Sequence, residues 1–115
     1  MDTSFIVACG EKRKDYLKEI IMSFGSVKFL VPEPVMQEIE LIKKNEAKVG
    51  RKILEMYDFE IVKCKESADN CVIKIAKERG AYIASFDSKL RKRARKENIK
   101  LITVRKGAYV MDLYY

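Results

Sequence analysis

Histidine and tryptophan are absent from this 115-residue chain, and only two prolines occur. The absence of histidine excludes His-based general acid–base catalysis, Ser-His-Asp and Cys-His triads, and most zinc sites. Any hydrolysis by this chain must therefore depend on carboxylates and on metal ions that prefer oxygen ligands. No segment is dominated by glycine, proline or serine, so an ordinary globular protein is expected.

Long apolar runs are missing as well. The longest, such as Phe5-Ile-Val-Ala-Cys9, are far too short to span a bilayer. Asp2 stands where a signal peptide would need positive charge. We therefore expect a cytoplasmic protein without a membrane segment, and the length fits a single domain, residues 1–115.

Cysteine is scarce, and its spacing is uninformative. Cys9, Cys64 and Cys71 are an odd number and form no C-x-x-C motif. We interpret all three as small buried hydrophobic residues in a reducing cytosol.

Positive charge, by contrast, is abundant. The formal net charge is +7 and the pI is near 9.3, which favours nucleic acid or anionic surfaces as partners. Seven cations fall within twelve residues: Lys89, Arg91, Lys92, Arg93, Arg95, Lys96 and Lys100. Such a run is usually a solvated helix face, and RNA contact is the alternative.

Apolar periodicity and helix-capping residues predict alternating helices and strands. Helices are expected over 15–24, 34–44, 47–57, 68–79 and 88–97, and strands over 27–31, 59–64, 81–86 and 99–104. Ser67 is the expected N-cap of the helix over 68–79. This alternation predicts an α/β fold, a three-layer sandwich with a central parallel sheet of four to five strands flanked by helices.

Acidic residues occur near the predicted strand ends, where parallel sheets bind ligands. Glu38 falls within an apolar helical stripe, although the edge of that stripe would let it reach water. Asp69 lies in the first turn of a helix, where the helix dipole alone favours an acid. Asp87 could simply be an N-cap, and Asp2 a terminal acid.

Four segments together resemble a PIN domain over nearly the whole chain. They are "DTSFIVAC" from Asp2, "VPEPVMQEIELI" from Val31, "ADNCVIKIAKERGAYIASFDSKLRKRAR" from Ala68 and "IKLITVR" from Ile99. The chain is most similar to compact single-domain archaeal PIN proteins. These comprise VapC-type toxins and relatives of the nuclease that processes small-subunit ribosomal RNA, and the last two segments lean towards the second group.

The resemblance implies a metal-dependent endoribonuclease. It implies that Asp2, Glu38, Asp69 and Asp87 bind Mg²⁺ or Mn²⁺ and are catalytic. It also implies that nearby hydroxyls, Thr3 or Ser4 and Ser85, orient these carboxylates. Beside such a site, RNA contact becomes the favoured interpretation for Lys89, Arg91, Lys92, Arg93, Arg95 and Lys96, with Arg105 and Lys106 as weaker candidates. Further expected partners are a second copy of the chain and an antitoxin or a ribosome-assembly factor.

Three positions depart from the family pattern. The family has an apolar strand before its first acid, whereas Asp2 directly follows Met1. Either the true start lies upstream, or the strand is very short, or "SFIVAC" is itself the strand. Asn70 replaces a second acid found in many relatives, and Phe86 replaces a polar residue. The missing strand and Asn70 favour the alternative function, a non-catalytic RNA-binding or ribosome-assembly module on the same fold, whereas Phe86 would alter the mouth of the substrate site.

Overall fold

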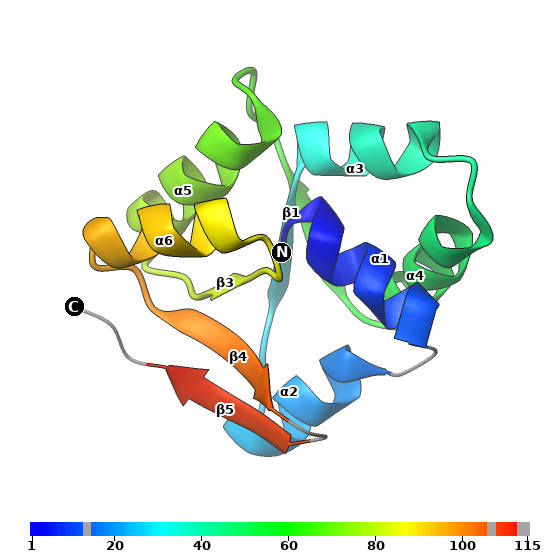
Figure 1. Ribbon diagram of the computed structural model, residues 1–115, viewed down its shortest axis with the longest axis horizontal. Helices are drawn as coiled ribbons and strands as arrows, with labels where there is room; N and C mark the ends of the chain where they lie inside the picture. Colours follow the sequence, from blue (N-terminus) through cyan, green and yellow to red (C-terminus); the bar gives the residue numbers. More distant parts are fainter. Residues whose placement is uncertain (13–14, 106–107, 113–115) are drawn as a thin grey trace.

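The computed structural model describes residues 1–12, 15–105 and 108–112. Six helices and five strands lie within these ranges (Figure 1). In chain order they are α1 (Thr3–Lys12), α2 (Tyr16–Phe24), β1 (Phe29–Pro32), α3 (Glu33–Leu41), α4 (Asn45–Glu55), β2 (Phe59–Val62), α5 (Ala68–Arg79), β3 (Ile83–Ala84), α6 (Ser88–Lys96), β4 (Leu101–Arg105) and β5 (Ala108–Asp112). The expected α/β class is thus observed.

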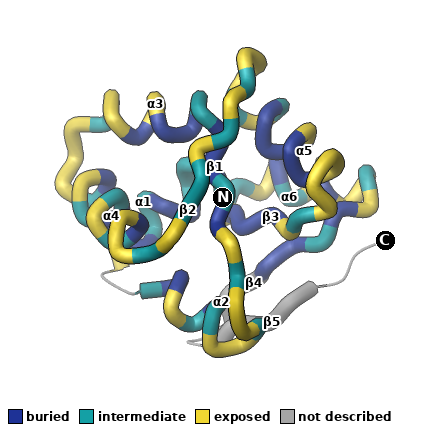
Figure 2. Tube along the Cα trace, turned by 180° about the vertical axis from the view of Figure 1, so that it is seen from behind, coloured by how far each residue is buried: buried dark blue, intermediate teal, exposed yellow. Residues whose placement is uncertain are grey.

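The strands form two sheets among the described residues. β1 pairs in parallel with β2, and β3 pairs in parallel with β4, which in turn pairs antiparallel with β5. The expectation of one central sheet of four to five strands is therefore not confirmed. The two sheets are arranged around the N-terminal end of the chain, which enters between β1 and β3 (Figures 1 and 2).

Helix α5 forms over the residues that its sequence predicts. Ser67 caps it by accepting a hydrogen bond from the Asn70 backbone N–H at 3.3 Å, and Gly80 ends it with a φ of 61° in the left-handed region. Other boundaries differ. Helix α3 ends at Leu41 rather than at residue 44 because Ile42 adopts an extended backbone. β3 is confined to two of the six residues predicted.

One of the three alternatives for the N-terminus, that "SFIVAC" is a strand, is wrong. "SFIVAC" is helical and not a strand. Its buried residues, Phe5, Ile6, Cys9 and Gly10, recur at the three-to-four-residue spacing of a single helix face. The apolar run also satisfies the simpler strand pattern, so periodicity over so short a segment does not decide between the two.

Helices α1 and α4 contact each other through their backbones. A Cβ atom added to Gly10 would collide with the carbonyl oxygen of Glu46, and one added to Gly50 would collide with the carbonyl oxygen of Ile6. Glycine at both positions is what permits this close approach. The two helices run side by side in Figure 1.

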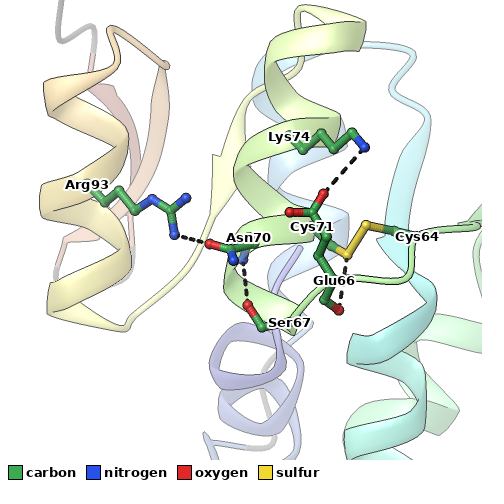
Figure 3. Close-up of a disulfide and its surroundings, with 7 residues drawn as sticks. All are labelled: Cys64, Glu66, Ser67, Asn70, Cys71, Lys74 and Arg93. Atoms are coloured by element: carbon green, nitrogen blue, oxygen red, sulfur yellow. Dashed lines mark hydrogen bonds and ion pairs between the residues drawn. A yellow bond between two sulfur atoms is a disulfide. The ribbon is translucent and has the colours of Figure 1, made fainter.

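Two of the three cysteines form a disulfide, which corrects the expectation of three free thiols. Cys64 follows β2, Cys71 lies in the first turn of α5, and their Cα atoms are 6.0 Å apart (Figure 3). Cys9 is the free cysteine and is fully buried. Burial raises the pKa of its thiol to about 12, against a weaker opposing effect of a hydrogen bond with the Tyr16 backbone.

The hydrophobic core extends between the sheets and the helices. Its largest fully buried side chains include Phe5, Leu17, Ile20, Ile83 and Leu101. No helix in the described parts of the chain has the length and apolar character needed to cross a membrane.

Candidate active site

Asp2 is one of only two polar residues that are buried among those described, with 5% of its surface exposed. Its carboxylate accepts hydrogen bonds from Ser4 Oγ at 2.9 Å and from the Phe5 backbone N–H at 3.2 Å. Ser85 Oγ donates a third, at 2.6 Å, from the end of β3. These donors compensate the carboxylate for its lost hydration and fix its orientation.

Ser85, the other buried polar residue, connects Asp2 to Asp87. The Asp87 backbone N–H donates to Ser85 Oγ at 3.0 Å. The Asp87 carboxylate caps α6 by accepting from the Lys89 N–H at 2.9 Å. Ser4 Oγ lies 3.3 Å from Ser85 Oγ and accepts from the Phe86 N–H at 3.0 Å. One hydroxyl network therefore holds the start of α1 against the start of α6.

Glu38 lies on α3 and is exposed, so it occupies the solvent-accessible edge of its helix. The hydroxyl of Thr3, at the start of α1, donates to Glu38 Oε1 at 2.5 Å. A second hydroxyl contact thus brings the α3 carboxylate to the same end of α1 as Asp2.

The pKa of Asp69 is raised in part by the charges of the other three acids. It lies in the first turn of α5 and is exposed. Loss of solvent around its carboxyl raises its pKa, and the negative charges of Asp87, Asp2 and Glu38 raise it further. A helix N-terminus normally stabilises a carboxylate, so this upward shift indicates that desolvation and repulsion among the acids together are the stronger influence.

The four acids are the right type of ligand for a divalent cation, but their side chains do not come together around one point. Carboxylate oxygens are the ligands that Mg²⁺ and Mn²⁺ prefer, and a cation would relieve the repulsion felt at Asp69. Among the described residues, however, no three Asp, Glu or Cys side chains converge closely enough to hold one metal ion together. The structure therefore brings four segments of the chain together without forming a closed ligand cage.

The chain terminus lies beside these acids. The Met1 ammonium donates to the Leu30 carbonyl of β1 at 2.8 Å, and the Asp2 backbone N–H donates to the Ala84 carbonyl of β3 at 3.3 Å. Burial lowers the pKa of the Met1 ammonium to about 6, although the Asp2 carboxylate favours the charged form.

The basic helix α6 starts at Asp87 and presents most of its cations to solvent. Lys89, Lys92, Arg93, Arg95 and Lys96 are exposed, while Leu90 and Ala94 are buried against the core. Arg91 differs, because its guanidinium donates to the Ser85 carbonyl at 3.0 Å and to the Ile102 carbonyl at 3.2 Å. Arg91 thus ties α6 to the strand ends. The side chain of Arg105 is not described, and Lys106 lies outside the described residues.

A contact between α5 and α6 was not predicted from the sequence. Arg93 Nη1 donates to Asn70 Oδ1 at 2.5 Å, one residue from Asp69 (Figure 3). The same guanidinium pairs with Glu97 at 3.7 Å. The Cys64–Cys71 disulfide lies beside the same turn of α5. No sequence pattern indicates that Asn70 and Arg93 meet. The spacing of Cys64 and Cys71 forms no motif, so no sequence pattern indicated the disulfide either.

Comparison with known proteins adds the family. No curated protein matches the sequence. The family model for a PIN-like domain matches residues 1–107, which include all four acids and the whole of α6. The chain therefore belongs to the PIN-like domain family.

Proposed function

We propose that this protein is an endoribonuclease that depends on Mg²⁺ or Mn²⁺ and binds the ion through Asp2, Glu38, Asp69 and Asp87. Proteins of the PIN domain family are generally metal-dependent nucleases. The observation that carries the proposal is the raised pKa of Asp69, whose causes include the charges of the other three acids. Carboxylates from four separate segments are unfavourable neighbours unless a cation joins them.

When bound, a divalent ion would supply Lewis-acid activation of water and stabilisation of the leaving oxygen in phosphodiester hydrolysis. The chain's own residues hold and orient its ligands. Ser4 and Ser85 fix the buried carboxylate of Asp2, and Thr3 fixes that of Glu38. Asp69 and Asp87 reach solvent more freely than Asp2, so they lie on the side from which a substrate would approach.

RNA is the substrate that the basic helix favours. Exposed cations on α6 begin two residues after Asp87 and continue to Lys96. Cations in this place would bind the phosphates that flank a scissile bond, and each neutralised phosphate would release counterions. Within the family, the "IKLITVR" segment leans towards processing of ribosomal RNA, with a ribosome-assembly factor as the partner, rather than towards a toxin held by an antitoxin.

Paired substitutions on one helix test the catalytic proposal. Glu38 and Glu40 both lie on α3 and are exposed, but Glu40 pairs with Arg51 at 3.4 Å instead of facing the acids. Glu38→Gln should reduce Mn²⁺-dependent cleavage of a single-stranded RNA by more than about 100-fold, beyond the loss typical of residues that only orient a ligand. Glu40→Gln should cleave as the wild type does.

Asp87→Asn provides an independent test, because asparagine is also a good N-cap and keeps α6 folded. Its cleavage rate should fall as far as that of Glu38→Gln. Wild-type rates in both variants would contradict the carboxylate mechanism.

A non-catalytic RNA-binding module is the second candidate. Two observations favour it: no three acids converge among the described residues, and Asn70 is engaged by Arg93. This function predicts RNA binding that persists in EDTA, with no cleavage product in Mg²⁺ or Mn²⁺. Cleavage that stops in EDTA and resumes with Mn²⁺ would exclude it.

A further inference from the structure

Phe86 is an exposed aromatic residue between two residues of the candidate active site. It follows Ser85, whose hydroxyl donates to Asp2, and it precedes Asp87. Its exposed fraction is 43%, although burial of a phenyl ring is favourable. Single exposed apolar side chains are common on protein surfaces, so exposure alone implies no role. The neighbours and the packing of Phe86 distinguish it from such residues.

The backbone of Phe86 is held by the same hydroxyls that orient the buried carboxylate. Its N–H donates to Ser4 Oγ at 3.0 Å, and the next N–H, that of Asp87, donates to Ser85 Oγ at 3.0 Å. Ser4 and Ser85 both donate to Asp2. Because consecutive Cα atoms are about 3.8 Å apart, Phe86 keeps a fixed and close position relative to the acid that follows it.

The ring of Phe86 is immobilised on one side. It stacks on Phe5, with ring centroids 5.4 Å apart and an angle of 11° between the ring planes. Tyr16 lies 5.9 Å from both of these rings. The three centroids form a nearly equilateral triangle, which places Phe5 and Tyr16 on the same side of Phe86. Since both are almost fully buried, the exposed surface of Phe86 is the side turned away from them.

We propose that Phe86 stacks on an unpaired base of the RNA next to the scissile phosphate, a role that rests on the proposed nuclease function. Proteins hold single-stranded nucleic acid by combining aromatic rings that stack on bases with cations that bind the phosphates. Here the exposed cations begin at Lys89, three residues after Phe86. A ring that is already immobilised loses little conformational freedom when a base stacks on it.

This contact defines the class of substrate. A base inside a double helix is paired and stacked on its neighbours, whereas a base in a single strand or a loop can expose its face to an aromatic side chain. Every base has such a face, so stacking tolerates different sequences. The protein should therefore prefer single-stranded RNA and loops to duplexes, with little dependence on the identity of the stacked base.

Tyr82 provides a matched control. It lies just before β3, whereas Phe86 lies two residues after that strand, and 37% of its surface is exposed. Its ring packs against Phe24 and Lys100 at the opposite end of β3 from the acids. Replacing either exposed ring with leucine keeps an apolar side chain and removes the aromatic face.

Binding of a fluorescently labelled oligouridine of about 12 nucleotides, within the usual site size, tests the contact when it is measured in EDTA to prevent cleavage. Phe86→Leu should weaken the affinity by about 5- to 100-fold, the range for loss of one base stack, and Tyr82→Leu should change it by less than about 2-fold. Phe86→Tyr, which keeps the ring, should restore most of the affinity. Equal affinities of the two leucine variants would overturn the proposal.

An abasic oligomer of the same length separates stacking from any indirect effect on the fold. The wild type should bind it more weakly than oligouridine, and Phe86→Leu should show a smaller difference between the two oligomers, by the factor that the substitution itself costs. The same difference in both proteins would show that Phe86 contacts no base. That outcome would overturn the proposal and leave the exposed ring as a contact for a protein partner.

The stacking contact and the proposed function can fail separately, because the binding measurements use neither metal nor cleavage. Cleavage that requires Glu38, together with an RNA affinity that does not depend on Phe86, would overturn the stacking contact alone. Base-dependent binding through Phe86 without any cleavage in Mg²⁺ or Mn²⁺ would overturn the nuclease alone, and the ring would then serve the non-catalytic RNA-binding function.

Discussion

At the residue scale, Asp69 is the most informative side chain. Its raised pKa reflects desolvation around the carboxyl and repulsion from three other acids, in a place where a helix dipole favours negative charge. Side chains held in such unfavourable electrostatic environments are typical of functional sites. Sequence patterns placed each acid near a strand end, but each also had an ordinary structural explanation. Their mutual repulsion is a property of the fold alone.

Replacing Asp69 with asparagine should stabilise the metal-free protein. The change removes repulsion with Asp87, Asp2 and Glu38 and should raise the free energy of unfolding in EDTA by a few tenths to about 1 kcal/mol, the scale of exposed charge pairs. The wild type should gain several degrees in Tm when MgCl₂ or MnCl₂ is added, and Asp69→Asn should gain much less. Thermal denaturation with and without metal measures both effects. A variant that is destabilised in EDTA would show that the acids do not repel.

Cys9 should make stability depend on pH in alkaline solution. Its pKa is about 12 in the folded protein, against 9.0 for an unperturbed thiol, because burial disfavours the thiolate. The resulting stabilisation is fully present below pH 9 and is lost as the pH rises towards 12. Between pH 9 and 10 the free energy of unfolding should fall by about 1 kcal/mol through this group, approaching about 1.4 kcal/mol per pH unit. Urea denaturation of Cys9→Ala should show a shallower fall over the same interval, although the variant is less stable at pH 7.

At the scale of elements, local signals predicted some segments completely and others not at all. Ser67 and Gly80 delimit α5 through capping, which depends only on neighbouring residues. Helix α1 was not predicted, because its five-residue apolar run is compatible with either period. Arg91 and Lys92 look equivalent in sequence, yet Arg91 turns inward to the Ser85 and Ile102 carbonyls whereas Lys92 is exposed. That difference follows from the orientation of α6 on the sheet, which composition does not encode.

Reducing the disulfide should loosen the start of α5. Cys64 and Cys71 are seven residues apart, and a crosslink of this span stabilises a fold by about 2.5 kcal/mol in the chain-entropy description. Dithiothreitol should therefore lower the Tm of the wild type and leave that of Cys64→Ser unchanged. Equal sensitivity of both proteins to the reductant would show that another group is responsible. Because Asp69 precedes Cys71 by two residues, metal-induced stabilisation should weaken in the reduced protein as well.

At the scale of the whole molecule, charge and acids are distributed unevenly. Helix α6, whose cations are exposed, begins at Asp87, whereas α4, which also carries exposed cations, packs against α1 on the other side of the molecule (Figure 1). The sequence alone predicts α6 and its charge. The separation of the two basic surfaces depends on packing of α1 against α4, which the sequence did not reveal.

This distribution predicts which surface the proposed RNA substrate would contact. Substituting Lys89, Lys92 and Lys96 with glutamine should reduce the slope of log affinity against log salt by about one for each phosphate that the variant no longer neutralises. The same change at Lys43, Lys48 and Lys52, which are also exposed, removes equal charge and should alter the slope far less. Arg91 stays in place in both variants, because its bonds to the strand ends support the fold. An equal reduction of the slope in the two triple variants would indicate a diffuse electrostatic attraction.

The close contact between α1 and α4 at Gly10 and Gly50 affects the position of the proposed metal ligands, although neither glycine is a ligand itself. Gly50 contacts α1 at Ile6, and Gly10 lies about 10 Å along the helix from Thr3, which starts α1 and binds Glu38. Gly50→Ala would push α1 off its neighbour and swing its leading end, shifting Asp2 and Thr3 relative to Glu38. Larger side chains at this helix contact would therefore change the affinity of the proposed site for metal without replacing any ligand.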